Sequence, residues 1–223
     1  MTFIGQLAAA QALLRDPSIP DGEQITFRVA SGDESYVSTS RVTRTLASGE
    51  EVYEFTTASP REQVTVELSL ATLATRSVRT VAMPGGLPLE TITSIVPRSG
   101  EQSTRIEAVN LNDLMFKLRG FPFASGQEIP VLFAAAARGS QASFAPHVSR
   151  VGSERLRVGS RTVETAKLEL VLSVPTLWRT FSLAPRTFFW YSTEPPYVLV
   201  RAETTQVPGS PRWLLEATGY SGW

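Results

Sequence analysis

Residues 64–70 read Val64-Thr65-Val66-Glu67-Leu68-Ser69-Leu70. Apolar side chains take every second position, and polar side chains take the positions between them. Successive side chains of a β-strand point to opposite faces, so this pattern predicts a strand with one buried and one wet face. Residues 24–29 (QITFRV) alternate in the same way. The two stretches indicate a half-buried antiparallel sheet.

Turn residues separate such stretches at short intervals. Glycine, proline, serine and aspartate gather at 31–33, 48–50, 59–60, 84–86 and 98–100. These residues favour tight turns because they tolerate or preset turn dihedral angles. Their spacing predicts six or seven consecutive antiparallel strands over residues 23–108.

Strand patterns resume after residue 128. We expect strands at 129–136, 142–151, 154–158, 161–174, 186–192, 196–204 and 211–220. No composition shift marks a domain boundary. The predicted fold is therefore mainly β (α+β), with residues 17–223 in a single domain.

Two segments have the period of a helix instead. In residues 1–16, Phe3, Leu7, Ala10 and Leu14 fall on one apolar stripe, which predicts an N-terminal amphipathic helix. That helix ends before Pro17, because the residue preceding a proline avoids the α region.

A second, shorter helix is expected at residues 111–119. Asn110 or Asn112 can cap its start, and Gly120 suits the position after its end. Its apolar face consists of Leu111, Leu114, Met115 and Leu118. We expect this face to pack against the concave side of the sheet.

Composition excludes several kinds of chemistry. The 223 residues contain no cysteine and one histidine, so disulfides, thiolate catalysis and multi-histidine metal sites are excluded within one chain. The formal net charge of +0 disfavours a dedicated nucleic-acid binder. Every apolar run is far shorter than the roughly 20 residues of a transmembrane helix.

No constellation of residues points to catalysis. The one histidine, His147, has no local carboxylate and nucleophile to complete a triad. Glu67, Glu169 and Glu203 sit on the polar sides of predicted strands, where solvated carboxylates are common. We therefore predict no catalytic residue, no metal ligand and no cofactor, and an enzyme is the least favoured class.

Aromatic residues concentrate in the second half of the chain. One sheet with two helices has difficulty hiding so many large rings, and a concave sheet lined with them would form an apolar pocket. Residues 187–191 (TFFWY) carry bulky apolar groups on both faces of a strand, and the sequence leaves open which pair points inward. The predicted lining of the cavity is Leu114, Met115, Leu118, Phe121, Phe123, Phe133, Phe189 and Trp190.

Several stretches resemble a bacterial family. They are residues 113–127 (DLMFKLRGFPFASGQ), 163–170 (VETAKLEL), 189–192 (FWYS), 197–203 (YVLVRAE) and 21–29 (DGEQITFRV). Their order over roughly residues 20–220 is similar to that of exported proteins of unknown function in the lipoprotein-carrier (LolA/LolB-like) superfamily. The resemblance implies a strongly curved antiparallel half-barrel around an apolar cavity plugged by helices. It also implies a lipid or the acyl chain of a lipoprotein as the ligand.

Two functional hypotheses follow. The leading one is a non-enzymatic binding or carrier protein for an apolar or amphiphilic ligand in the cell envelope. The alternative is a structural or protein-interaction domain whose own side chains fill the cavity. Residues 1–14 lack the basic start of a secretory signal, so we expect either a cytoplasmic protein or one whose leader was removed, which would be periplasmic or envelope-bound. The oligomeric state cannot be inferred from the sequence.

Overall fold

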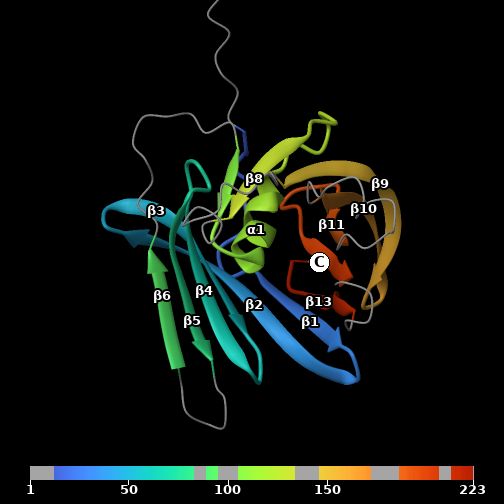
Figure 1. Ribbon diagram of the computed structural model, residues 1–223, viewed down its shortest axis with the longest axis horizontal. Coiled ribbons are helices and arrows are strands. Elements are labelled where there is room, and N and C mark those ends of the chain that lie inside the picture. The colour runs from blue at the N-terminus through green and yellow to red at the C-terminus, as the bar shows by residue number, and fades with distance from the viewer. Residues whose placement is uncertain are drawn as a thin grey trace, which may run out of the picture.

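A single curved sheet surrounds a short helix. The computed structural model describes residues 13–82, 89–94, 105–133, 146–171, 186–205 and 212–222. Within them, thirteen strands form one sheet in the order β6-β5-β4-β3-β2-β1-β13-β12-β11-β10-β9-β8-β7. The helix α1 (Leu111–Lys117) lies on the concave side of this sheet (Figure 1). The predicted mainly β fold, with one strongly curved sheet and a central helix inside it, is confirmed.

The strand boundaries follow the alternation of the sequence closely. The first strands are β1 (Gln24–Ser31), β2 (Glu34–Ala47), β3 (Glu50–Ala58), β4 (Glu62–Ser69), β5 (Thr75–Ala82), β6 (Leu89–Ser94) and β7 (Ile106–Ala108). After α1 and the 3-10 turn η2 (Leu118–Gly120) come β8 (Ile129–Phe133), β9 (His147–Val158), β10 (Arg161–Val171), β11 (Arg186–Ser192), β12 (Leu199–Thr205) and β13 (Trp213–Tyr220). The two strands expected at 142–151 and 154–158 are one strand, β9, which has an irregularity against β10 near Gly152.

The first and the last strand of the described residues are neighbours in the sheet. β1 pairs with β2 on one side and with the last strand, β13, on the other. Consecutive strands pair antiparallel from β1 to β6 and from β8 to β13. The exception is β7, which lies at the opposite edge from β6 and pairs parallel with β8.

The prediction of consecutive antiparallel strands over 23–108 therefore holds for six strands and is wrong for the seventh, β7. Parallel neighbours need a crossover connection, and α1 with η2 lies between β7 and β8 in the chain and supplies it.

The turn between β2 and β3 has the backbone conformation expected of a tight hairpin. Ser48 and Gly49 have φ values of 53° and 83°, both in the left-handed region. Two such residues fit the twist of a two-residue hairpin turn. The turns predicted at 84–86 and 98–100 lie outside the described residues. So does most of the predicted N-terminal helix, of which only residues 13–16 are described, with a bend at Leu13 and Leu14.

The interior contains two apolar clusters. The main cluster consists mostly of buried side chains from β1 and from β7 to β13. The second cluster, called the β2–β5 cluster, consists of buried side chains from β2, β3, β4 and β5 together with Ile19. α1 and η2 together form one helical segment, residues 111–120. Its Leu114, Met115 and Leu118 belong to the main cluster, whereas Phe116 packs against the β2–β5 cluster. The helix thus packs between the two clusters. The side chains predicted to form its buried face are the ones that pack into the main cluster.

Local interactions explain where the helical segment begins. The side chain of Asn110 accepts a hydrogen bond from the backbone N–H of Asp113 at 3.0 Å, so Asn110 is the N-cap. Gly120 serves a purpose that the sequence did not reveal. A Cβ atom at this position would lie 2.4 Å from the carbonyl oxygen of Arg15, so the glycine is needed for a close approach of two backbones.

Replacing Leu114 with Asp should destabilise the protein severely. Leu114 is 0% exposed, and an aspartate there would be a buried charge without a partner. We expect the free energy of unfolding to fall by about 3 kcal/mol or more, measured by denaturant titration. The control is Leu46→Asp at the β2–β3 turn, where the leucine is 70% exposed and the expected change is within about 0.5 kcal/mol. Equal losses in the two variants would contradict the buried position of α1.

Candidate functional site

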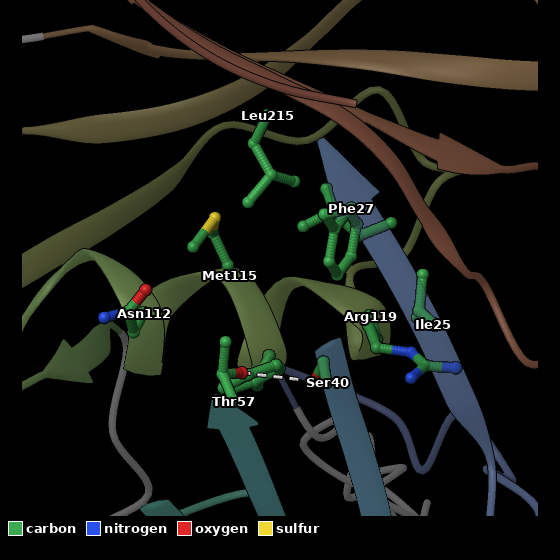
Figure 2. A pocket seen from close by; sticks show the side chains of 10 residues that line it. Ile25, Phe27, Ser40, Thr57, Asn112, Met115, Arg119 and Leu215 are labelled. Atoms are coloured by element: carbon green, nitrogen blue, oxygen red, sulfur yellow. Dashed lines mark hydrogen bonds between the residues drawn. The ribbon is translucent and has the colours of Figure 1, made fainter. Parts of the chain in front are cut away.

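A hollow lies between α1 and the concave face of the sheet (Figure 2). It is placed where the main cluster meets the β2–β5 cluster. Most of its wall is apolar and comes from both halves of the molecule. The lining residues are Ile25, Phe27, Ser40, Thr57, Asn112, Met115, Phe116, Arg119, Leu199 and Leu215.

Small side chains on β2 leave room for this hollow. The inward-facing row of β2 runs from Tyr36 through Ser38 and Ser40 to Val42, opposite inward residues of β1 and β3. Ser38 and Ser40 are 4% and 3% exposed, so both serines are buried in the interior. A serine side chain fills less space than the tyrosine or the branched valine at the ends of the row. Ser40, which belongs to this row, lies in the wall of the hollow.

The polar atoms of the hollow are few and incompletely bonded. The Thr57 hydroxyl donates a hydrogen bond to the Ser40 hydroxyl at 3.2 Å. Neither side chain forms another hydrogen bond with a described residue. Asn112 follows the N-cap by two residues, and its side-chain amide has no hydrogen-bond partner within the described part of the chain. The hollow thus combines an apolar wall with a small patch of unused hydrogen-bonding capacity.

The hollow is nearly filled by the side chains around it. The volume open to the centre of a water molecule is about 30 Å³. One ordered water needs roughly 10–15 Å³ on that measure. The space therefore fits about two waters, and a chain-like ligand would have to displace side chains.

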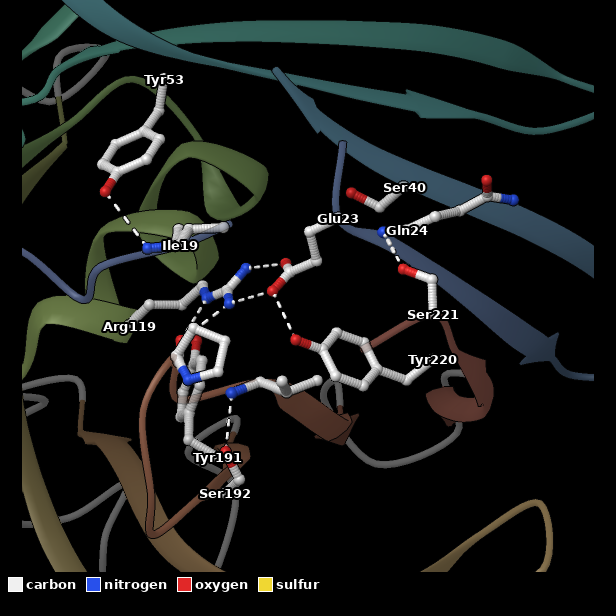
Figure 3. Close-up of polar contacts among 12 residues, drawn as sticks. Ile19, Glu23, Gln24, Ser40, Tyr53, Arg119, Tyr191, Ser192, Tyr220 and Ser221 are labelled. Carbon is white, nitrogen blue, oxygen red and sulfur yellow. Dashed lines mark hydrogen bonds and ion pairs between the residues drawn. The ribbon is translucent and has the colours of Figure 1, made fainter. Parts of the chain in front are cut away.

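A buried ion pair fixes the end of the helical segment beside the hollow (Figure 3). Arg119 and Glu23, which are 2% and 3% exposed, form a bidentate pair, and Arg119 also donates to the carbonyl oxygen of Pro196. The Tyr220 hydroxyl donates to Glu23 at 2.9 Å. Burial, and then the negative charge of Glu23, raise the pKa of Tyr220. Because Glu23 balances the guanidinium, the pair presents no net charge to the hollow.

A second buried pair fixes the start of the helix. The Asp113 carboxylate accepts hydrogen bonds from the Thr75 hydroxyl at 2.8 and 3.0 Å and from the Val109 N–H at 2.7 Å. Lys117 lies 3.5 Å from Asp113 and donates to the carbonyl oxygen of Glu107. Burial raises the pKa of Asp113 and lowers that of Lys117, although the attraction between the two opposes both shifts. α1 is therefore held at both ends by polar contacts inside the protein.

Arg15 and Asp16, in the segment before β1, are hydrogen-bonded to η2 and β3. The Arg15 N–H donates to the Gly120 carbonyl at 2.9 Å, and the Tyr53 hydroxyl donates to the Asp16 carboxylate at 2.6 Å. Burial, followed by the hydrogen bond and the negative charge of Asp16, raises the pKa of Tyr53 to about 12, against the opposing charge of Arg44. This segment therefore contacts both η2 and β3.

The residues predicted from the sequence occupy the same interior but mostly lie beside the hollow. Of the residues predicted to line a cavity, Met115 is the one in the wall of the hollow. The main cluster contains Leu114, Leu118, Phe121, Phe123 and Phe189, and Phe133 packs against this cluster partly buried. Sequence patterns do not point to Ser40, Thr57 or Asn112, because polar residues in a strand or helix are normally assigned to the wet face.

The strand β11 shows which aromatic pair points inward. Phe189 and Tyr191 belong to the main cluster, and the Tyr191 hydroxyl donates to the Met115 carbonyl at 2.7 Å. Trp190 is on the opposite, outer face with Phe188. The Lys167 ammonium lies 4.8 Å from the centre of each of these two rings. Trp190, which was predicted to line the cavity, is therefore buried on the outside of the sheet.

The described residues show little that suggests chemistry of other kinds. The His147 imidazole lies 4.0 Å from the Glu128 carboxylate. Among the residues that the structure describes, no three histidine, aspartate or glutamate side chains gather as metal ligands would. In the same part of the chain, no helix has the length and hydropathy to cross a bilayer. The expectation that the protein is not an enzyme remains a prediction.

Comparisons with known proteins place the chain in no family. No protein-family model matches it, and no curated protein matches it significantly. One similar structure is a Bacteroides fragilis protein described as exported, with a YmcC-like fold. The TM-score is 0.40 at 13% identity, over 94% of this chain and 99% of that one.

Another similar structure is a Parabacteroides distasonis protein described as a lipoprotein. The TM-score is 0.37 at 8% identity, over 91% of this chain and 96% of that one. The resemblance to the lipoprotein-carrier superfamily remains a prediction. The function proposed below therefore rests on the residues of this chain.

Breaking the Arg119–Glu23 pair should cost much of the stability. Arg119→Met leaves the Glu23 carboxylate buried with only the Tyr220 hydroxyl, and we expect a loss of about 3–5 kcal/mol in the free energy of unfolding. The control is Arg28→Met, which removes an ion pair to Glu216 in which the Arg28 side chain is 61% exposed. That variant should lose less than about 1 kcal/mol. A small loss in both variants would show that the pair does not anchor η2.

Tyr53 should make the protein sensitive to alkali. Its folded-state pKa exceeds the ordinary tyrosine value of about 10. The stabilisation from this phenol is therefore complete below about pH 10 and lost as the pH rises through about 12. The free energy of unfolding, measured between those pH values, should fall more steeply for the parent than for Tyr53→Phe. Parallel slopes would refute the buried phenol.

Proposed function

We propose that this chain is a non-enzymatic binding protein for an apolar or amphiphilic ligand, such as a lipid or an acyl chain. The observation that carries the proposal is the hollow beneath α1, whose wall is formed mainly by Ile25, Phe27, Met115, Leu199 and Leu215. A concave apolar site with few polar groups is the usual form of a small-molecule site. The ligand would lie between the helix and the sheet.

A ligand can enter only if side chains of the helix move aside. Met115 and Phe116 lie on the helix side of the hollow, and methionine adapts readily because it is unbranched and has three rotatable side-chain bonds. Rotation of these side chains, or a small shift of α1, would enlarge the space toward Leu199 and Leu215. The buried polar contacts at both ends of α1 would limit such a shift.

The proposed compartment is the cell envelope. Its support is the sequence resemblance at residues 113–127 and 163–170 to exported proteins. A fractionation experiment on the native host would test it, since a soluble cytoplasmic pool alone would contradict the proposal.

The second candidate function is a structural or protein-interaction domain with a filled interior. The observation that favours it is the free volume of about 30 Å³, which is far smaller than a ligand site of roughly 300–1,000 Å³. In this case α1 is simply part of the core, and no small molecule enters.

Ligand titration distinguishes the two candidates. The folded protein should bind N-phenyl-1-naphthylamine with a rise in fluorescence, and a dodecyl compound should displace this dye with a dissociation constant in the range of about a micromolar. Absence of saturable binding by a folded sample would favour the filled interior.

Neighbouring leucines on β13 provide a matched pair of variants. Leu215→Phe places extra atoms in the hollow and should weaken dye binding at least about fivefold, while overpacking lowers stability by about 1–3 kcal/mol. Leu214→Phe makes the same change on the outer face, where Leu214 is paired with Glu203, and should leave binding unchanged. Equal effects on binding would locate the ligand elsewhere.

A further inference from the structure

The polar patch of the hollow limits the ligands that the site can accept. Ser40 and Thr57 together carry two hydroxyl protons, and the single bond between them at 3.2 Å uses one. Because Thr57 donates in that bond, the O–H of Ser40 has no acceptor among the described residues. Because Ser40 is only 3% exposed, this unused donor is largely shielded from bulk water. An unused buried donor favours a ligand atom that accepts a hydrogen bond.

Asn112 adds a second unused group. It lines the same hollow from α1, whereas Ser40 and Thr57 line it from β2 and β3 (Figure 2). Its amide contains both a donor and an acceptor, and neither is bonded to a described residue. A ligand group placed there can therefore be a hydroxyl, which donates and accepts, or a carbonyl, which only accepts.

The charges around the hollow exclude an ionised group. Arg119 is the charged residue in its lining, and the two oxygens of Glu23 and the Pro196 carbonyl accept its hydrogen bonds. A carboxylate or phosphate placed in the hollow would meet no uncompensated cation. Burial of an unpaired charge costs far more than burial of a neutral group that is hydrogen-bonded.

We infer that the ligand of this site carries an uncharged hydrogen-bonding group, an alcohol or an ester or amide carbonyl, at the end of an apolar chain. This group contacts the Ser40–Thr57 hydroxyls and the Asn112 amide, and the chain lies along Phe27, Leu199 and Leu215. The inference rests on the proposed function and narrows its ligand to neutral amphiphiles.

Displacement of N-phenyl-1-naphthylamine by four compounds with the same chain length tests the inference. Dodecanol and lauramide are neutral, whereas laurate and dodecyl phosphate are ionised at about pH 8. The neutral compounds should bind at least about tenfold more tightly than the ionised ones. Equal affinities for all four would overturn the inference and leave the proposed function standing. No binding of the dye or of any of the four would overturn both.

Two serines on one strand provide the matched variants. Ser40→Ala removes a hydroxyl from the hollow and should weaken dodecanol binding by roughly three- to tenfold. Ser38→Ala is the control, because Ser38 is equally buried but its hydroxyl donates to the Ala58 carbonyl at 3.1 Å and lies outside the lining. Asn112→Leu should weaken lauramide binding by a similar factor. If Ser38→Ala and Ser40→Ala change dodecanol affinity equally, the hydroxyl of Ser40 does not contact the ligand and the inference fails.

Discussion

The buried ion pair between Arg119 and Glu23 ties together parts of the chain that are far apart in sequence. It connects η2 to the residue before β1, and through Tyr220 and Pro196 it reaches β13 and the turn between β11 and β12. Two buried charges are tolerated only when each is paired and hydrogen-bonded, and this geometry meets both conditions. The helical segment is therefore fixed inside the curve of the sheet.

The position of α1 between the two clusters determines how the interior is divided. Its Leu114, Met115 and Leu118 side chains complete one apolar cluster, and Phe116 extends the other, where it stacks on Phe55 with ring centres 4.2 Å apart. Between the clusters, the small side chain of Ser40 lines the hollow together with Met115 and Phe116 of the helix. The hollow lies at this junction because the side chains of the two clusters leave a space between them there.

The two candidate functions differ in what happens at this junction. In a binding protein, the imperfect packing is the site, and the flexible Met115 lets the space grow when a ligand arrives. In a domain with a filled interior, the same gap is a minor packing defect of the kind that most proteins contain. The unused hydroxyl proton of the buried Ser40 favours the first reading, since a buried polar group without a partner is costly unless something else supplies one.

Local patterns in the sequence determined the strands, the hairpin turn at Ser48 and Gly49, and the buried face of the helix after Asn110. These features depend on side-chain periodicity and on turn and cap chemistry over a few residues, so one chain segment suffices to reveal them. The tertiary structure alone decided that β7 lies beside β8 and that Trp190 points outward. It also decided that Ser40, Asn112 and Leu215 surround one hollow. The pairing of β1 with both β2 and β13 brings Ser40 and Leu215 to the same face, and a shift of one residue in strand register would send each of these two side chains to the other face. Such register depends on contacts between distant segments, which no local pattern contains.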